Sequence, residues 1–166
     1  MKYSLSEAQK NEGDVLAALR VAAMKESLKA IGRFDPERAR NRFLDTFSPE
    51  NTWKIIIDET RKEESDQEGS LSTVLAGFFV IHQMFENAEN YLQLDHFYIH
   101  PDFQSKGIGG EVLKSLLENA KQLGLPIRLG ALKNSQSNQF YKLHGFVATH
   151  EDEWDVYYIF QPNKSR

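Results

Sequence analysis

The chain has 166 residues and a mass of 19.1 kDa, with 40% hydrophobic and 27% charged residues. This make-up predicts one globular domain over residues 1–166, with a core large enough to fold without disulfides or structural metal. The absence of cysteine excludes thiol nucleophiles, cysteine-based zinc sites and disulfide bonds. The net charge of -4 argues against nucleic acid as a partner, because domains that bind a phosphate backbone are usually basic.

The sequence predicts no targeting or membrane-spanning segment. The opening residues, MKYSLSEAQKNEGD, contain no apolar run, and no later stretch approaches the roughly 20 apolar residues of a membrane span. We therefore expect a cytoplasmic protein with no membrane partner. The acidic balance weakly favours small or cationic partners.

Two helices are predicted first. Apolar residues recur on one helical face between Asp14, a candidate N-cap, and Lys29, and Gly32 marks the end of this helix. Asp35 followed by Pro36 is typical of the start of a second helix. Its buried stripe recurs at every fourth residue: Ala39, Phe43 and Phe47.

Three strands are predicted next. The β-rich runs 53–57 and 73–81 flank the charged segment 58–70, which predicts a hairpin with an exposed, mobile loop. The third strand covers residues 91–99. If alternation along it is regular, one face carries Gln93, Asp95, Phe97 and Ile99.

The second half of the chain alternates between helices and strands. The stretch 104–110 is glycine-rich, and an amphipathic helix is predicted over 111–123. Then come a strand, a helix and a last pair of strands, at 126–132, 137–143, 146–148 and 156–160. This order predicts a mixed α/β layer around one sheet.

The glycines at 107, 109 and 110 lie between a strand and a helix, where free backbone N–H groups and the helix dipole favour an anion. The Walker pattern is absent, because Lys106 precedes the first glycine. The dinucleotide pattern GxGxxG fails at Val112. From the glycines alone, a phosphate site and a simple connecting turn both stay open.

The residues around these glycines resemble the acyl-CoA signature of the GNAT superfamily of N-acetyltransferases, which is Gln or Arg, two variable residues, Gly, any residue, then Gly or Ala. The matching segment runs from Ile99 to Gly109. A second block, with Asn134, Phe140–Tyr141 and Gly145–Phe146, is similar to the Asn, Phe-Tyr, Gly-Phe block of the family. The resemblance covers about residues 53–160, including the hairpin segment 75–78.

The resemblance implies a central mixed, mostly antiparallel sheet with helices on both faces and a splayed cleft for acetyl-CoA. Backbone amides of the glycine loop would hold the CoA pyrophosphate, the third strand would pair with the pantetheine arm, and Asn134 would hydrogen-bond that arm. The expected cofactor-binding residues are Phe97, Tyr98, Ile99, Gln104, Ser105, Lys106, Gly107, Ile108, Gly109, Gly110 and Asn134.

The resemblance also implies catalytic roles. Tyr141 matches the family tyrosine that protonates the leaving thiolate, although a tyrosine that only packs on the adjacent helix is the alternative. Asp95 lies on a strand where relatives often carry a base, acting directly or through water. A shift of one residue in register would turn Asp95 to the other face as a merely solvated or paired aspartate. Gln93 and Leu129, at other positions where relatives place a base, cannot accept a proton.

The histidines carry weaker signals. His96 alternates away from Asp95 on a regular strand, so a single site would not use both, and His100 lies in a turn. His82, His144 and His150 show no metal-ligand spacing, and we expect no metal.

These features predict an enzyme that transfers an acetyl group from acetyl-CoA directly to a primary amine of a small molecule or peptide, in a ternary complex. Direct transfer agrees with the lack of a cysteine nucleophile. A non-catalytic acyl-CoA sensor of the same fold is the alternative. The acceptor is expected near residues 24–34, the hairpin and the turn 151–155, where Trp154 either binds a cationic amine or caps the turn. A homodimer is compatible with the family.

Overall fold

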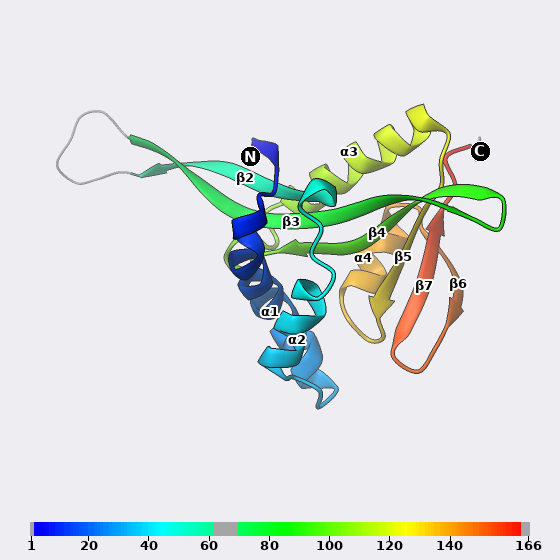
Figure 1. Cartoon of the computed structure of the whole chain (residues 1–166), viewed down its shortest axis with the longest axis horizontal. Helices are drawn as coiled ribbons and strands as arrows, with labels where there is room; N and C mark the ends of the chain where they lie inside the picture. The colour runs from blue at the N-terminus through cyan, green and yellow to red at the C-terminus, as the bar shows by residue number, and fades with distance from the viewer. Residues whose placement is uncertain (1, 62–69, 164–166) are drawn as a thin grey trace.

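The computed structural model describes residues 2–61 and 70–163 (Figure 1). Seven strands form one sheet in the order β1-β2-β3-β4-β5-β7-β6, and all neighbours are antiparallel except β4 and β5. The strands are β1 Tyr3–Glu7, β2 Thr52–Arg61, β3 Ser70–Glu86, β4 Glu89–Ile99, β5 Ile127–Leu132, β6 Val147–Glu151 and β7 Asp155–Phe160. The helices are α1 Gly13–Ala30, α2 Pro36–Leu44, α3 Ile108–Leu123 and α4 Ser137–Leu143. The predicted fold class is confirmed.

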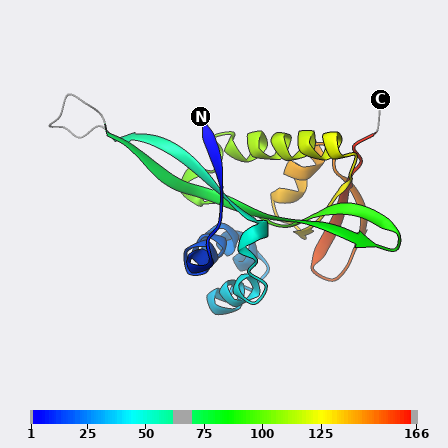
Figure 2. The same ribbon diagram turned by 45° about the horizontal axis from the view of Figure 1, so that its top comes forward.

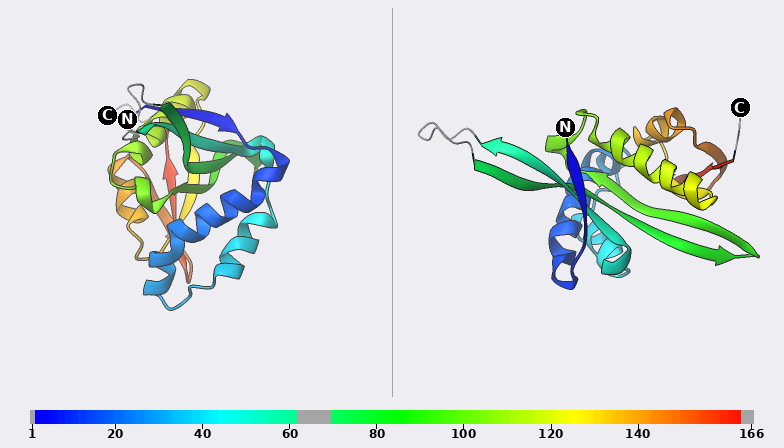
Figure 3. Two further views of the ribbon diagram at one scale, coloured as in Figure 1. Left: turned by 90° about the vertical axis from the view of Figure 1, so that its left-hand side faces the viewer. Right: turned by 90° about the horizontal axis from the view of Figure 1, so that it is seen from above.

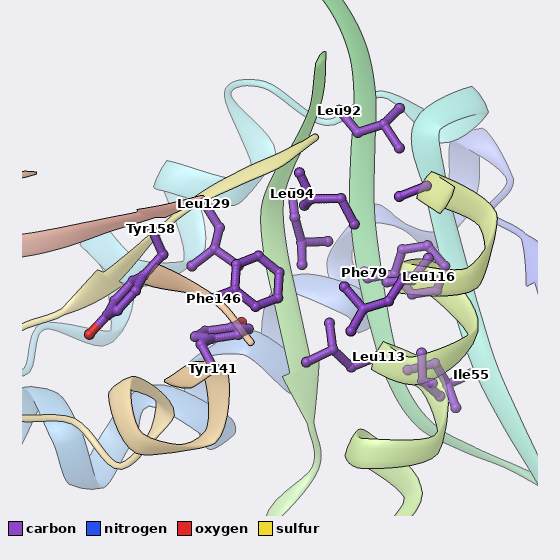
Figure 4. Packing of buried hydrophobic residues seen from close by; sticks show 14 of the residues in the cluster. Ile55, Phe79, Leu92, Leu94, Leu113, Leu116, Leu129, Tyr141, Phe146 and Tyr158 are labelled. Carbon is purple, nitrogen blue, oxygen red and sulfur yellow. The ribbon is translucent and has the colours of Figure 1, made fainter. Parts of the chain in front are cut away.

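Helices cover both faces of the sheet (Figure 2). Helices α1 and α2 run side by side on one face, as the left panel of Figure 3 shows, while α3 and α4 lie on the other. Each face has its own apolar cluster. The larger one joins the sheet to α3 and α4 and includes Leu94, Leu113 and Tyr141 (Figure 4); the smaller one packs Leu16, Phe43 and Phe78 on the α1 and α2 side. None of the described helices combines the length and apolarity that a bilayer crossing requires.

The start of α1 differs from the predicted one. The helix begins at Gly13, and Asp14 lies inside its first turn, where the carboxylate pairs with Arg40 at 2.6 Å instead of capping. The predicted cap of α2 is confirmed, because the Asp35 side chain accepts a hydrogen bond from the Arg38 N–H at 3.1 Å. Phe47 lies beyond the end of α2 but still packs on Phe43, with ring centroids 5.3 Å apart.

The first hairpin is longer than its sequence suggests. Strand β2 continues to Arg61 and β3 begins at Ser70, so residues 58–61 and 70 of the predicted loop belong to strands. Residues 62–69, the rest of that loop, lie outside the described residues. Strand β1 was not predicted at all, because the polar segment YSLSE forms a strand only by pairing with β2 at the sheet edge.

A β-bulge interrupts the alternation along β4. Val80 of β3 pairs with His96 and Ile81 pairs with Leu94, which leaves Asp95 without a partner in the ladder. Leu92 and Leu94 therefore pack in the same apolar cluster as Phe97 and Ile99, an even-numbered pair followed by an odd-numbered one. The prediction that Gln93 and Asp95 share a face with Phe97 and Ile99 is wrong, because the extra residue reverses the facing of the strand.

The sheet splits where its one parallel pair ends. Strands β4 and β5 pair only at Leu92 with Ile127 and at Gln93 with Arg128. Beyond these positions the two strands diverge, as Figure 4 shows. Asp95 lies just past the point of divergence. The splay between these two strands that the resemblance implies is present.

Candidate active site

The glycine loop connects the end of β4 to α3 and presents exposed backbone. The Gln104 side-chain amide donates to the Ile99 carbonyl at 2.9 Å, which ties the loop to the end of β4. Ser105 and Gly107 adopt left-handed conformations with φ of 64° and 85°, and α3 begins directly afterwards at Ile108. Successive N–H groups in such a turn, next to a helix N-terminus, form a concave anion site.

The packing of the protein does not by itself require the next two glycines. A Cβ at Gly109 would lie 3.6 Å from the Ile99 side chain, and one at Gly110 would lie 3.5 Å from His144, both ordinary contacts. Both positions lie in the first turn of α3, next to the N–H groups that favour an anion. Lys106 is exposed beside them, with its ammonium 5.6 Å from the Phe103 ring centre.

A second loop joins β5 to α4, at the end of β5 that does not pair with β4. Asn134 in this loop is exposed and adopts a left-handed backbone conformation with a φ of 66°. The sequence analysis missed Asn138. Its side-chain amide donates to the Leu132 carbonyl at 2.8 Å, and its oxygen accepts from the Tyr158 hydroxyl at 2.8 Å. Asn138 thus joins the end of β5, α4 and β7, and its only signal was its place inside the second sequence block.

Tyr141 of α4 is buried with a free hydroxyl. Its ring packs against Phe140 and Phe146, with centroids 5.4 and 5.5 Å away. Burial raises the pKa of the phenol above its usual value, with a smaller contribution from Tyr98, so the hydroxyl keeps its proton at neutral pH. The hydroxyl makes no hydrogen bond to the residues that the structure describes and keeps some access to solvent, since no described side-chain N or O atom is both fully buried and without a partner. Figure 4 shows the hydroxyl on the side of the ring that faces β4.

Asp95 lies on the opposite face of the sheet, in a cavity of about 400 Å³ between α2 and strands β3 and β4. Its carboxylate is 3.1 Å from Nε2 of His82. Burial raises the pKa of Asp95, and the nearby His82 and a hydrogen bond from Gln93 partly oppose that rise. The cavity is lined by Arg42, Phe43, Thr46, Phe47, Ser48, Val80, His82, Asp95 and His96.

The expectation that Asp95 and His96 serve different sites is wrong, since both line this cavity. The bulge at Asp95 removes the alternation on which that expectation depended. His96 is nevertheless tied up, because its Nδ1 lies 3.1 Å from the Tyr98 hydroxyl, which itself accepts from Nε of Arg20 at 3.1 Å. Burial, helped by Arg20 and Arg42, lowers the pKa of His96 to about 3 and keeps the ring neutral.

Two other residues singled out in the sequence have structural partners. His100 Nδ1 accepts from the Asp102 N–H at 3.1 Å and so caps the turn that follows β4. The Trp154 ring is covered on one face by the Arg33 guanidinium, 3.8 Å from the ring centre, which links the loop after α1 to the turn between β6 and β7. That face of Trp154 is therefore closed to a cationic ligand in this structure. Within residues 2–61 and 70–163 no group of three or more His, Asp or Glu side chains is placed to hold a metal ion.

Comparisons with known proteins agree with this arrangement. No curated protein sequence matches the chain at a significant level. Among solved structures, PH1933 from Pyrococcus horikoshii OT3 has a TM-score of 0.66 at 20% identity and covers 96% of this chain and 98% of its own. The PaiA N-acetyltransferase from Thermoplasma acidophilum, solved in complex with coenzyme A, has a TM-score of 0.64 at 16% identity and covers 97% of this chain and 99% of its own.

A third neighbour is the ribosomal-protein-S18-alanine N-acetyltransferase from Escherichia coli, with a TM-score of 0.62 at 11% identity, covering 99% of this chain and 97% of its own. At these identities the likeness concerns the fold. The sequence itself matches the profile described as the acetyltransferase (GNAT) family over residues 29–146, which is well over half of the chain. The chain therefore belongs to the GNAT family of acetyltransferases.

Proposed function

We propose that the protein is an N-acetyltransferase that transfers an acetyl group from acetyl-CoA directly to a primary amine within a ternary complex. The observation that carries this proposal is the divergence of β4 from β5, with Tyr141 in the cluster on one face of the sheet and Asp95 in the cavity on the other. A thioester lying in such a gap has an acid on one side and a base on the other. We further propose that residues 1–166 act as one cytoplasmic domain.

Three parts of the chain would hold the co-substrate. The left-handed turns at Ser105 and Gly107 and the N-terminus of α3 favour the pyrophosphate, and Lys106 adds a positive charge. The main chain of residues 97–99, which has no strand partner on the β5 side, favours the amide-bearing pantetheine arm. Asn134, exposed in the loop after β5, would hydrogen-bond the same arm. The coenzyme A complex of the Thermoplasma neighbour supports this use of the fold.

Asp95 and Tyr141 would divide the proton transfers. Asp95 accepts a proton from the ammonium, so that the free amine attacks the acetyl carbon and a C–N bond forms. Tyr141 donates its proton to the sulfur as the C–S bond breaks, because the raised pKa of its phenol keeps that proton in place until the thiolate develops. No covalent enzyme intermediate is needed.

Replacing Tyr141 with phenylalanine separates this proposal from the sensor alternative. We expect Tyr141→Phe to lower turnover by about 10²-fold, the ordinary size of a general acid's contribution, while calorimetric CoA binding stays unchanged. Turnover is measured as free CoA released from acetyl-CoA in the presence of a panel of amines and peptides. Tyr91→Phe is the matched control, because it removes a hydroxyl from a mostly buried tyrosine in the distal hairpin, where that hydroxyl donates to Glu86 at 2.8 Å.

Two results would contradict the proposal. If the unmodified protein binds CoA but releases none with any acceptor, the sensor is the better description. If CoA is released at the same rate without an acceptor, the protein is a hydrolase of acyl-CoA, and the transferase assignment fails.

A further inference from the structure

We propose that His82 and Asp95 act as one proton-accepting pair, in which Asp95 faces the acceptor amine and His82 carries the proton on to solvent. This proposal depends on the proposed N-acetyltransferase function and gives His82 a role in it. His82 was not selected from the sequence, because it lies on a different strand from Asp95 and matches neither signature.

The two side chains meet because of the bulge in β4. His82 of β3 pairs in the ladder with Gln93, two positions before Asp95, and the unpaired Asp95 turns toward the same face as His82. Nε2 of His82 then lies 3.1 Å from the Asp95 carboxylate, within hydrogen-bond distance. Both groups line the cavity.

Both members of the pair have access to solvent. The side chain of His82 is 27% exposed and that of Asp95 is 41% exposed, so neither is sealed from water. A proton can therefore enter the pair from a ligand in the cavity and leave through the imidazole. An imidazole is suited to this task because it can accept a proton at one ring nitrogen and release one from the other.

The charged and titratable groups around the pair come from three elements. Arg42 of α2 lines the cavity without a carboxylate partner within 4 Å among the residues that the structure describes. His96 of β4 is held neutral by burial. Glu50 lies in the turn before β2, and its pKa is lowered mainly by hydrogen bonds from its own backbone and from Ser48, with a smaller contribution from His82.

These neighbours leave the pair as the proton acceptor of the cavity. His96 Nδ1 is already engaged by the Tyr98 hydroxyl. Arg42 is already protonated and cannot accept a further proton. Glu50 does not line the cavity. The pair is thus composed of one carboxylate at the ligand side and one imidazole that relays the charge.

The proton steps balance without any further reactant. The exchange begins when the Asp95 carboxylate takes one proton from an N–H of the ammonium, which leaves a neutral amine and a carboxylic acid. The acid then passes that proton to the Nε2 lone pair of neutral His82, whose own proton is on Nδ1. This step regenerates the carboxylate and gives an imidazolium. The imidazolium releases the proton to water, and both groups return to their starting states.

The test uses the full chain with His82→Gln, Asp95→Asn and the double variant, assayed with an amine that the unmodified protein acetylates. Glutamine can still donate a hydrogen bond to Asp95 but cannot carry a proton. We expect His82→Gln to lower kcat by about 10- to 100-fold with an unchanged KM for acetyl-CoA. The double variant should be no slower than Asp95→Asn alone, because the two residues act as a unit.

The pH profile gives a readout that a purely structural role would not produce. In the folded protein the nearby His82 lowers the pKa of Asp95, so its loss should raise that pKa and move the acid limb of the kcat/KM profile to higher pH. A carboxyl ¹³C titration of Asp95 reports the same shift without any acceptor. His150→Gln is the matched control, since His150 stacks on Tyr157 outside the cavity.

Each outcome decides the matter. If His82→Gln keeps its activity within twofold, with an unmoved acid limb and Asp95 titration, the pair is overturned while the transferase assignment stands. Additive losses in the double variant also overturn it. If the unmodified protein acetylates nothing, the proposed function fails and the pair fails with it.

Discussion

Asp95 and His96 are neighbours in the chain and line one cavity, yet burial moves their pKa values in opposite directions. The pKa of Asp95 rises and that of His96 falls to about 3, because in both cases the low-dielectric surroundings favour the uncharged form. His96 is fixed further by the chain of contacts from Arg20 through Tyr98. One residue is thus prepared to exchange a proton and the other to remain neutral.

The neutral His96 predicts an acid-sensitive fold. The pKa of His96 is about 3 in the folded chain and 6.5 in its unperturbed state. Between these two pH values the unfolded chain binds a proton at His96 and the folded chain does not. The unfolding free energy should therefore decrease by roughly 1.4 kcal/mol per pH unit as the pH falls through this window, and this contribution is fully present above pH 6.5. Urea unfolding at several pH values measures the slope.

A variant isolates this contribution. In His96→Asn the amide oxygen can accept from Tyr98 in place of Nδ1, but the side chain does not titrate, so the slope between pH 6 and 4 should become shallower. His150→Asn, at an exposed position, should leave the slope as it is. An unchanged slope in His96→Asn would mean that other groups cause the acid sensitivity.

At the scale of elements, the sequence predicted the features that depend on neighbouring residues. It missed those that depend on pairing between distant strands. The N-cap at Asp35, the amphipathic α3 and the glycine loop follow from residue types at short spacing, and all are present. Strand β1 depends on a partner roughly 50 residues away in the chain, and the bulge at Asp95 on one roughly 15 residues away. No pattern within either segment predicts them. The missed bulge affected the predicted catalytic site most, because the bulge determines which face of the sheet the Asp95 side chain lies on.

At Gly77, β3 runs so close to β4 that a side chain has no room. A Cβ there would lie 2.3 Å from the Tyr98 carbonyl oxygen, a backbone atom that cannot move aside without disturbing β4. We expect Gly77→Ala to lower the unfolding free energy by about 1–3 kcal/mol, as overpacking usually does, measured by denaturant unfolding. Gly109→Ala is the control, because its Cβ would make an ordinary contact at 3.6 Å within a helix. Equal stability of the two variants would contradict this account.

At the scale of the whole molecule, the backbone ladder is almost interrupted between β4 and β5. Only two residue pairs join these strands, although the apolar cluster continues across them through Leu94 and Leu129. The right panel of Figure 3 shows how far the β3 and β4 hairpin extends from the rest of the body. The cavity next to this junction could not be predicted, because Arg42, His82 and Asp95 come from three separate elements.

A ligand that bridges this junction should stabilise the fold. At a free CoA concentration about 100 times its Kd, the unfolding free energy should increase by about 2.7 kcal/mol. For a chain of this size that corresponds to a rise in Tm of roughly 5–10 °C, measured by calorimetry. Adenosine, which lacks the pyrophosphate and the pantetheine arm, should have little effect. Absence of a shift at millimolar CoA would count against the proposed cofactor site.

The bulge at Asp95 also makes the exact number of residues in β4 matter. Leu94 before it and Phe97 after it reach the same core only because two residues separate them, an even number, whereas a regular strand would need an odd number. A substitution in β4 changes one side chain, whereas the deletion of a single residue would turn one of these two apolar residues toward the opposite face. The length of this strand segment is therefore as much a part of the information in the chain as the identity of its residues.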